Sequence, residues 1–111
     1  MRKLFVAVLI TAFAGVLATQ ALAASRSVKI GDDYFVRKGS MPTITVRKGT
    51  RVTWRWTGKD LHNLAVTRGP AKFRSGFKTS GTFSRTVRRA GTYTIVCTVH
   101  PGMKMKLRVT G

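Results

Sequence analysis

Glycine recurs about once in every ten residues along most of this chain, and this spacing limits its possible folds more than any other feature. Glycine marks turns, so the segments between neighbouring glycines can hold short strands but not helices of ordinary length. Within these segments β-branched and aromatic residues alternate with polar ones, which is the pattern of half-buried strands. We therefore predict strands over residues 43–46, 50–56, 62–67, 82–87, 92–97 and 104–109.

One predicted strand shows the alternation most clearly. Val52, Trp54 and Trp56 share one face of it, with polar residues between them, so the tryptophans are expected in a core. About seven or eight such strands separated by turns predict an all-β fold, a Greek-key β-sandwich. Residues 68–80 lack a clean alternation and are expected to form a long surface connection.

The first 23 residues have the organisation of a secretory signal peptide. Two basic residues precede an apolar stretch over residues 4–17, and a small-x-small cleavage site follows at residues 21–23. An uncleaved membrane anchor is the alternative, because the apolar residues continue toward Ala24. We predict an exported protein, periplasmic or extracellular, in which residues 1–23 are the signal peptide and residues 24–111 form one domain that acts as a monomer.

Cys97 is the only cysteine of the chain. In an exported domain of this size a single thiol is free, paired with another chain, or bound to a metal. His100 and Met103 follow it by three and six residues, and thiolate, imidazole and thioether donors together suit copper much better than magnesium or calcium. His62 is the only other histidine, so it is the candidate for a second nitrogen ligand.

A second methionine leaves the last ligand open. Met103 stands three residues after His100 and Met105 stands five residues after it, so the spacing admits either. We favour Met103, because Met105 falls inside the predicted strand over residues 104–109, where its side chain would be part of the sheet pattern.

Three stretches of the chain carry a family resemblance: Cys97-x-x-His100-x-x-Met103, His62-Asn63 and Gly91-Thr92-Tyr93. Together they resemble the cupredoxins of the plastocyanin, pseudoazurin and amicyanin group, and the loop length is closest to that of amicyanin. The resemblance implies one type 1 blue copper ion with four ligands: His62, Cys97 and His100 in the equatorial plane and Met103 as the weak axial ligand. It also implies that Asn63 links the two ligand-bearing segments through hydrogen bonds.

Basic residues dominate the charge of the chain. Without residues 1–23 the protein keeps 19 of its 21 Lys and Arg side chains and all three of its carboxylates, which leaves a net charge of +16. Such a surface attracts anions, and the candidates are redox protein partners with acidic docking surfaces and the anionic cell envelope. No nucleic acid partner is expected, because the protein is exported and its basic residues accompany no stacking motif.

The donor set and the resemblance predict a one-electron carrier between redox partners, cycling between Cu(II) and Cu(I), and not an enzyme. The sequence offers no Ser/His/Asp set, no paired carboxylates suited to acid–base work and no phosphate-binding loop. Two alternatives stay open: an extracytoplasmic copper storage or delivery protein, and a basic polyanion-binding β-domain without a redox role.

The resemblance also places His100 at the protein surface, as the route for electrons. It is expected to lie in an apolar patch with Pro101 and Gly102. Basic residues, among them Lys59 and Lys104, are expected to ring this patch and to steer an acidic partner toward it.

Overall fold

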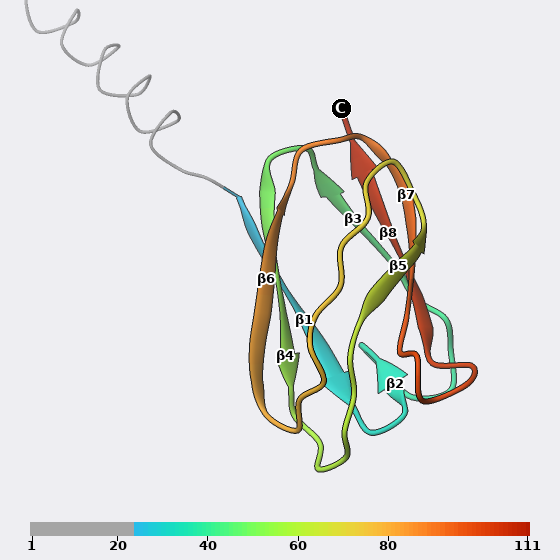
Figure 1. Cartoon of the computed structure of the whole chain (residues 1–111). Coiled ribbons are helices and arrows are strands. Elements are labelled where there is room, and N and C mark those ends of the chain that lie inside the picture. Colours follow the sequence, from blue (N-terminus) through green and yellow to red (C-terminus); the bar gives the residue numbers. More distant parts are fainter. Residues whose placement is uncertain (1–23) are drawn as a thin grey trace, which may run out of the picture.

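Eight strands form two four-stranded sheets that face each other in the computed structural model, which describes residues 24–111 (Figure 1). The strands are β1 (Ser25–Gly31), β2 (Tyr34–Phe35), β3 (Thr43–Arg47), β4 (Thr50–Trp56), β5 (Ala65–Arg68), β6 (Gly81–Val87), β7 (Gly91–Val96) and β8 (Lys104–Thr110). The predicted signal peptide, residues 1–23, lies outside the described residues. Within residues 24–111 no helix is long and apolar enough to cross a membrane.

The strand order confirms the predicted all-β sandwich. One sheet has the order β2-β1-β4-β6 and the other the order β3-β8-β7-β5. β1 pairs with β4 and β3 pairs with β8 in parallel, whereas the other neighbours are antiparallel. Parallel neighbours cannot be joined by a tight hairpin, so the chain crosses repeatedly from one sheet to the other, as expected for a Greek-key sandwich.

The core lies between the sheets and is built from alternate residues of the strands. Trp54 and Trp56 of β4 are buried, as the alternation predicted. Tyr93 and Ile95 of β7 are buried as well, and Cys97 follows them by the same step of two residues. The core therefore fixes the position of the thiol at the end of β7.

The predicted strand over residues 62–67 is shorter in the structure. It is β5, and it begins only at Ala65, because the backbone before it pairs with the connection that follows β5. The amide of His62 donates to the carbonyl of Lys78, and the amide of Lys78 donates to the carbonyl of His62, both at 3.0 Å. This bridge holds His62 apart from the regular sheet.

The connection over residues 68–80 is not wholly a surface segment, in contrast to the prediction. Phe73 packs against the core, and Ser75 is buried with its hydroxyl accepting a hydrogen bond from the amide of Leu64 at 3.0 Å. In Figure 1 this segment runs between β6 and β5. It therefore covers one open side of the sandwich.

Two strands were not among the predicted ranges. The first three residues of β1 are all exposed, so the alternation there is weak, and β2 has only two residues. These strands matter for the site, because the turn between them reaches it.

One end of the sandwich, which we call the histidine pole, collects three turns. The strands that lead into them end together, since Ile30 lies opposite Trp56 and Val96 lies opposite Lys104. The turns comprise residues 32–33, 57–64 and 97–103.

Candidate metal centre

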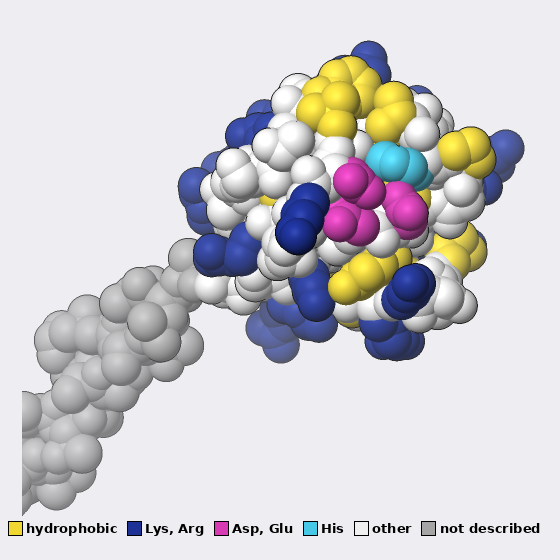
Figure 2. All heavy atoms as spheres, turned by 90° about the horizontal axis from the view of Figure 1, so that it is seen from below, with side chains coloured by type: hydrophobic (Ala, Val, Ile, Leu, Met, Phe, Trp, Pro, Cys, Tyr) yellow, Lys and Arg dark blue, Asp and Glu magenta, His cyan; other side chains and the backbone are white. Residues whose placement is uncertain are grey.

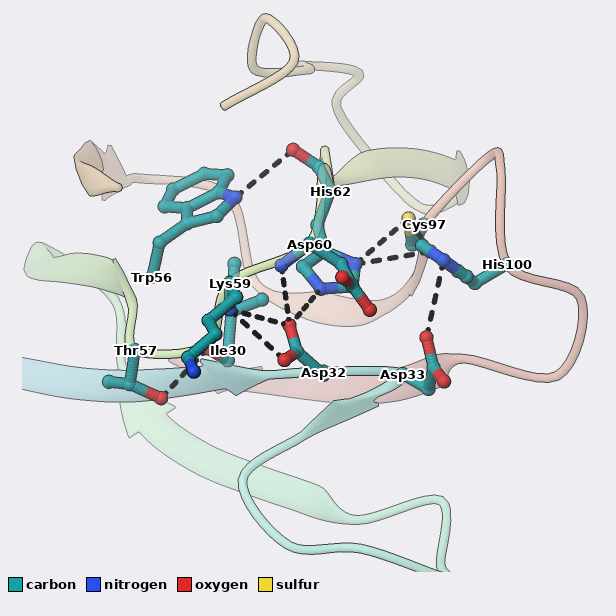
Figure 3. A network of polar contacts seen from close by, with 10 residues as sticks. All are labelled: Ile30, Asp32, Asp33, Trp56, Thr57, Lys59, Asp60, His62, Cys97 and His100. Carbon is teal, nitrogen blue, oxygen red and sulfur yellow. Dashed lines mark hydrogen bonds and ion pairs between the residues drawn. The ribbon is translucent and has the colours of Figure 1, made fainter. Parts of the chain in front are cut away.

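Three side chains with metal-binding atoms meet at the histidine pole (Figure 3). Cys97 directly follows β7, His100 lies in the loop between β7 and β8, and His62 precedes β5. Cys97 and His62 are buried, and the side chain of His100 is 29% exposed. The fold therefore brings together the three residues that the sequence indicated as nitrogen and sulfur donors.

The separations of the donor atoms suit a single metal ion. The Nδ1 atoms of His62 and His100 are 3.1 Å apart, and Sγ of Cys97 lies 3.9 Å from the first and 3.5 Å from the second. A metal about 2.0 Å from nitrogen and about 2.3 Å from sulfur, with ligand angles of about 100–130°, separates two nitrogens by about 3.1–3.6 Å and nitrogen from sulfur by about 3.3–3.9 Å. One ion can therefore contact all three atoms.

An aspartate holds each histidine ring from its other side. Oδ1 of Asp32 lies 3.1 Å from Nε2 of His62, and Oδ1 of Asp33 lies 3.2 Å from Nε2 of His100 (Figure 3). The two aspartates form the two-residue turn between β1 and β2. Asp33 has a φ of 72°, in the left-handed region that Asp tolerates better than most residues. One tight turn thus supplies the partners of both rings.

These contacts determine where the ring protons are. An ionised carboxylate only accepts hydrogen bonds, so Nε2 of each ring carries the proton and donates to its aspartate. Each Nδ1 then directs a lone pair toward the other Nδ1 and toward the thiol of Cys97. Two lone pairs facing each other repel unless a cation lies between them. The donor atoms are therefore arranged for a cation, and the soft sulfur donor favours copper.

The two candidate methionines have different surroundings. Met103 is buried, its carbonyl accepts a hydrogen bond from the amide of Cys97 at 3.0 Å, and its amide donates to the carbonyl of His100 at 3.1 Å. Met105 lies within β8 opposite Ile95, as expected for a residue of the sheet, and both methionines contribute to the core. Met103 is thus the methionine whose backbone closes the ligand loop.

Asn63 links the two ligand-bearing segments, as the resemblance implied. Its side chain is fully buried, and its Oδ1 accepts hydrogen bonds from the amide of Thr98 at 2.9 Å and from the hydroxyl of Thr98 at 3.1 Å. Thr98 directly follows Cys97, and Asn63 directly follows His62. The thiol and the buried ring are therefore tied together through their neighbours in the chain.

Asp32 also anchors the turn that leads to His62. Its carboxylate accepts hydrogen bonds from the amides of Asp60 at 2.9 Å and Lys59 at 3.0 Å. These two bonds, together with the contact to His62, lower the pKa of Asp32 from 3.8 to about 2. Nε1 of Trp56 donates to the carbonyl of His62 at 3.0 Å. Both the ring and the main chain of His62 are thereby fixed.

The surface around the exposed ring is apolar and acidic. Figure 2 shows the three carboxylates of the domain beside the exposed histidine, with most Lys and Arg side chains nearer the rim. Leu61 and Val99, which directly precede the two histidines, are each 47% exposed. The basic residues expected to ring this patch are not its only charges, since Asp33 pairs with the ring of His100.

Sequence reasoning therefore missed Asp32 and Asp33 as residues of the site. The one signal that could have indicated them is their rarity, because a chain with 21 basic residues keeps only three acidic ones. Two of the three contact the histidines, and Asp60, the third, donates its backbone amide to Asp32.

Comparisons with known proteins agree with this site. The family model described as copper binding proteins, plastocyanin/azurin family, matches residues 28–110. Amicyanin-alpha of Methylorubrum extorquens is 34% identical over 94 residues, which cover 81% of this chain and 76% of that protein. A solved Cu(I) form of an amicyanin variant is 28% identical, with a TM-score of 0.62 over 79% of this chain and 84% of the other.

Two further solved structures share the cupredoxin fold. A purple cupredoxin from Nitrosopumilus maritimus has a TM-score of 0.64 over 77% of this chain and 99% of its own. A copper-containing nitrite reductase from Thermus scotoductus has a TM-score of 0.64 over 81% of this chain but only 23% of its own. Both are 22% identical to this chain, so they show the fold alone.

Proposed function

Because the chain belongs to the plastocyanin/azurin family of copper binding proteins, we propose that it carries single electrons between redox proteins outside the cytoplasm. Its cofactor is a type 1 copper ion. We assign four ligands to it: His62, Cys97 and His100 in the equatorial plane and Met103 in the axial position. The observation that supports this function most directly is the cluster of two imidazole nitrogens and one sulfur within 4.8 Å of one another.

In this function the protein holds the metal-binding side chains in fixed positions. A copper ion in a His₂Cys site with a distant methionine supplies one-electron chemistry between Cu(I) and Cu(II). Asp32 and Asp33 hold the two rings from outside, and Asn63 holds the segment next to the thiol. Donors that cannot rearrange suit an ion that changes charge, because little reorganisation then accompanies each electron.

The partly exposed ring of His100 is the proposed route for electrons. It is 29% exposed, whereas His62 and Cys97 are buried. A redox partner that docks on the histidine pole would therefore approach the metal most closely through this ring. The protein accepts one electron from a donor protein and passes it to an acceptor protein, so no substrate is converted and the protein is not an enzyme.

The burial and the hydrogen bonds of the ligands favour a carrier over a storage or delivery protein. Delivery requires ligands that release the ion, but three of the four proposed ligands are buried. Each histidine is also held at two atoms or more, His62 at its ring and carbonyl and His100 at its ring and carbonyl. A polyanion-binding domain without a metal would leave the facing Nδ1 lone pairs of His62 and His100 unexplained.

The visible spectrum of the purified protein after addition of Cu(II) tests the proposed function. One equivalent of copper should produce an intense visible absorption, because a thiolate bound to Cu(II) absorbs strongly, and reduction should remove it. Repeated oxidation and reduction should restore the colour without loss of metal. Loss of metal in each cycle would instead indicate delivery, and colour retained in Cys97→Ser would contradict the ligand assignment.

Export is part of the proposal and has its own test. Residues 1–23 act as the signal peptide and residues 24–111 as the copper-binding domain, so the mass of the protein recovered from the periplasm or the medium should correspond to a chain that starts at Ala24. A mass that corresponds to the uncleaved chain in a membrane fraction would favour the anchor instead.

A further inference from the structure

The end of the sandwich opposite the histidine pole, which we call the distal pole, carries three chain segments. They are the start of β1, the turn between β3 and β4, and the turn between β6 and β7, because Ser25 lies opposite Arg51 and Thr50 lies opposite Val87. In Figure 1 all three lie away from the loop between β7 and β8, which holds the metal centre. The two poles are therefore separated by the length of the strands.

A hollow of about 300 Å³ lies beside the distal pole, between the turn that follows β6 and the connection that follows β5. Phe73 and Tyr93 supply aromatic walls, and no carboxylate lines it. Four of the lining residues are cations: Lys72, Arg85, Arg88 and Arg89. The hollow thus combines four cationic residues with apolar surface.

No carboxylate of the described chain neutralises these cations. The ion pairs within residues 24–111 join aspartates to histidines, and all three aspartate side chains belong to turns at the histidine pole. The positive charge of the hollow is therefore available to an external anion, and its apolar walls strengthen the attraction by limiting the access of water.

Local contacts hold one of the cations and the backbone beside another. The guanidinium of Arg85 lies over two rings, 5.5 Å from the centre of Phe73 and 5.1 Å from that of Phe83. The hydroxyl of Tyr93 donates a hydrogen bond to the carbonyl of Arg89 at 2.7 Å, which fixes the turn after β6. A small number of placed charges on apolar walls suits an anionic group that is attached to an apolar body.

We propose that the distal pole docks on an anionic phospholipid membrane and that the hollow accepts a phosphodiester headgroup. Ala24, the proposed first residue after cleavage, lies at this pole, since its carbonyl accepts a hydrogen bond from the amide of Arg51 at 3.0 Å. The aspartate side chains lie at the other pole, so an anionic surface attracts the distal pole more strongly than the histidine pole.

Docking in this orientation turns the metal centre away from the lipid and toward its redox partners. The proposal rests on the proposed function in one respect, because export is what places the domain beside such a membrane. The two are nevertheless separable in experiment, since docking uses the distal pole and electron transfer uses the histidine pole.

Vesicle binding tests the proposal. The copper-loaded protein of residues 24–111, which contains all eight strands, is sedimented at about 0.15 M salt with phosphatidylcholine vesicles that either contain or lack about 30% phosphatidylglycerol. The hollow variant carries Lys72→Gln, Arg88→Gln and Arg89→Gln and keeps the stacked Arg85. A matched variant carries Lys29→Gln, Arg55→Gln and Lys106→Gln, which remove the same charge from exposed positions elsewhere.

The parent should bind the anionic vesicles and not the neutral ones. Each cation close to an anionic membrane changes binding by about fivefold, so the hollow variant should bind about a hundredfold more weakly and the matched variant within about tenfold of the parent. Equal losses in the two variants would show that net charge alone attracts the protein and would overturn the proposal.

A parent that binds no vesicles of either kind would also overturn the proposal. If this parent instead binds polyglutamate, and the hollow variant does not, the hollow takes an acidic polypeptide. The visible spectrum is recorded in the same samples. A parent that keeps its blue colour but does not bind vesicles contradicts only membrane docking. A colourless parent contradicts the proposed function.

Discussion

Nε2 of His62 lies 3.1 Å from Oδ1 of Asp32, on the side of the ring opposite to the Nδ1 that faces Cys97. A carboxylate that accepts the outer N–H of a ligand imidazole makes the inner nitrogen a stronger donor and fixes the plane of the ring. The buried histidine is therefore tuned from outside the metal centre by a residue of another turn.

Replacing Asp32 by Asn should weaken Cu(II) binding and raise the reduction potential. An amide oxygen accepts the hydrogen bond of His62 less strongly than a carboxylate, so the ring becomes a weaker donor and Cu(II) loses more than Cu(I). Loss of such an outer partner costs about 10–100-fold in metal affinity. Competition titration and voltammetry measure both quantities. Asp60→Asn is the matched control, because it removes the same charge nearby and should change the potential less.

Acid should remove part of the stability that Asp32 provides. Its pKa is lowered to about 2 in the folded protein, first by the hydrogen bond from the amide of Asp60, so the carboxylate stabilises the fold above the unfolded pKa of 3.8. This contribution is lost as the pH falls from about 4 through 2. In the metal-free protein the difference in melting temperature between the parent and Asp32→Asn should be constant above pH 4 and shrink below it. A difference that grows toward pH 2 would contradict the assignment.

Replacing Asn63 by Ala should destabilise the metal-free protein by about 1–3 kcal/mol, because the amide and the hydroxyl of Thr98 both lose their acceptor at a part-buried site. Denaturant unfolding measures this change in free energy. Thr98→Val is the control, since it removes only the hydroxyl bond and keeps the backbone amide as a donor. It should therefore cost less than Asn63→Ala, and the reverse order would contradict the proposed link.

Replacing Met103 by Leu should preserve the blue colour and raise the reduction potential, because a weak axial donor is lost while the equatorial plane survives. Met105→Leu should leave the potential nearly unchanged and cost less than about 1.5 kcal/mol of stability, as a swap of similar volume in a core does. If the potential responds to Met105 and not to Met103, the axial ligand is the residue in β8.

Electron transfer to an acidic acceptor protein should slow as salt rises. The domain has a net charge of +16, which steers an anionic partner over long distances, and the Debye length falls from about 30 Å at 0.01 M to about 8 Å at 0.15 M. Stopped-flow rates measured across this range give the slope. A basic acceptor should show the opposite slope. Rates that do not change with salt concentration would indicate docking through apolar contacts alone, such as those of Leu61 and Val99.

The sequence could predict the sandwich because most of its strands show a local alternation of apolar and polar residues. In β4 the alternation of buried and exposed residues is visible in the chain itself, and Trp54 and Trp56 lie where it places them. β1 was missed because its first three residues are exposed, so no alternation marks its start. Its position depends on parallel pairing with β4, which is a tertiary contact that no local pattern encodes.

The metal donors could be predicted for a similar reason. The chain has only two histidines and one cysteine, which are His62, His100 and Cys97, so few combinations of nitrogen and sulfur ligands are possible. The partners of the rings could not be predicted, because the contacts of Asp32 and Asp33 depend on how the turn after β1 is placed against two other turns. Packing between the sheets decides that placement.

The turn between β1 and β2 also limits how this chain can evolve. Asp32 and Asp33 reach different rings only because they are consecutive at the tip of a hairpin whose register pairs Ile30 with Phe35. Inserting or deleting one residue at the tip would carry at least one carboxylate away from its ring, although the composition would hardly change. Related chains that keep both aspartates should therefore keep the length of this turn.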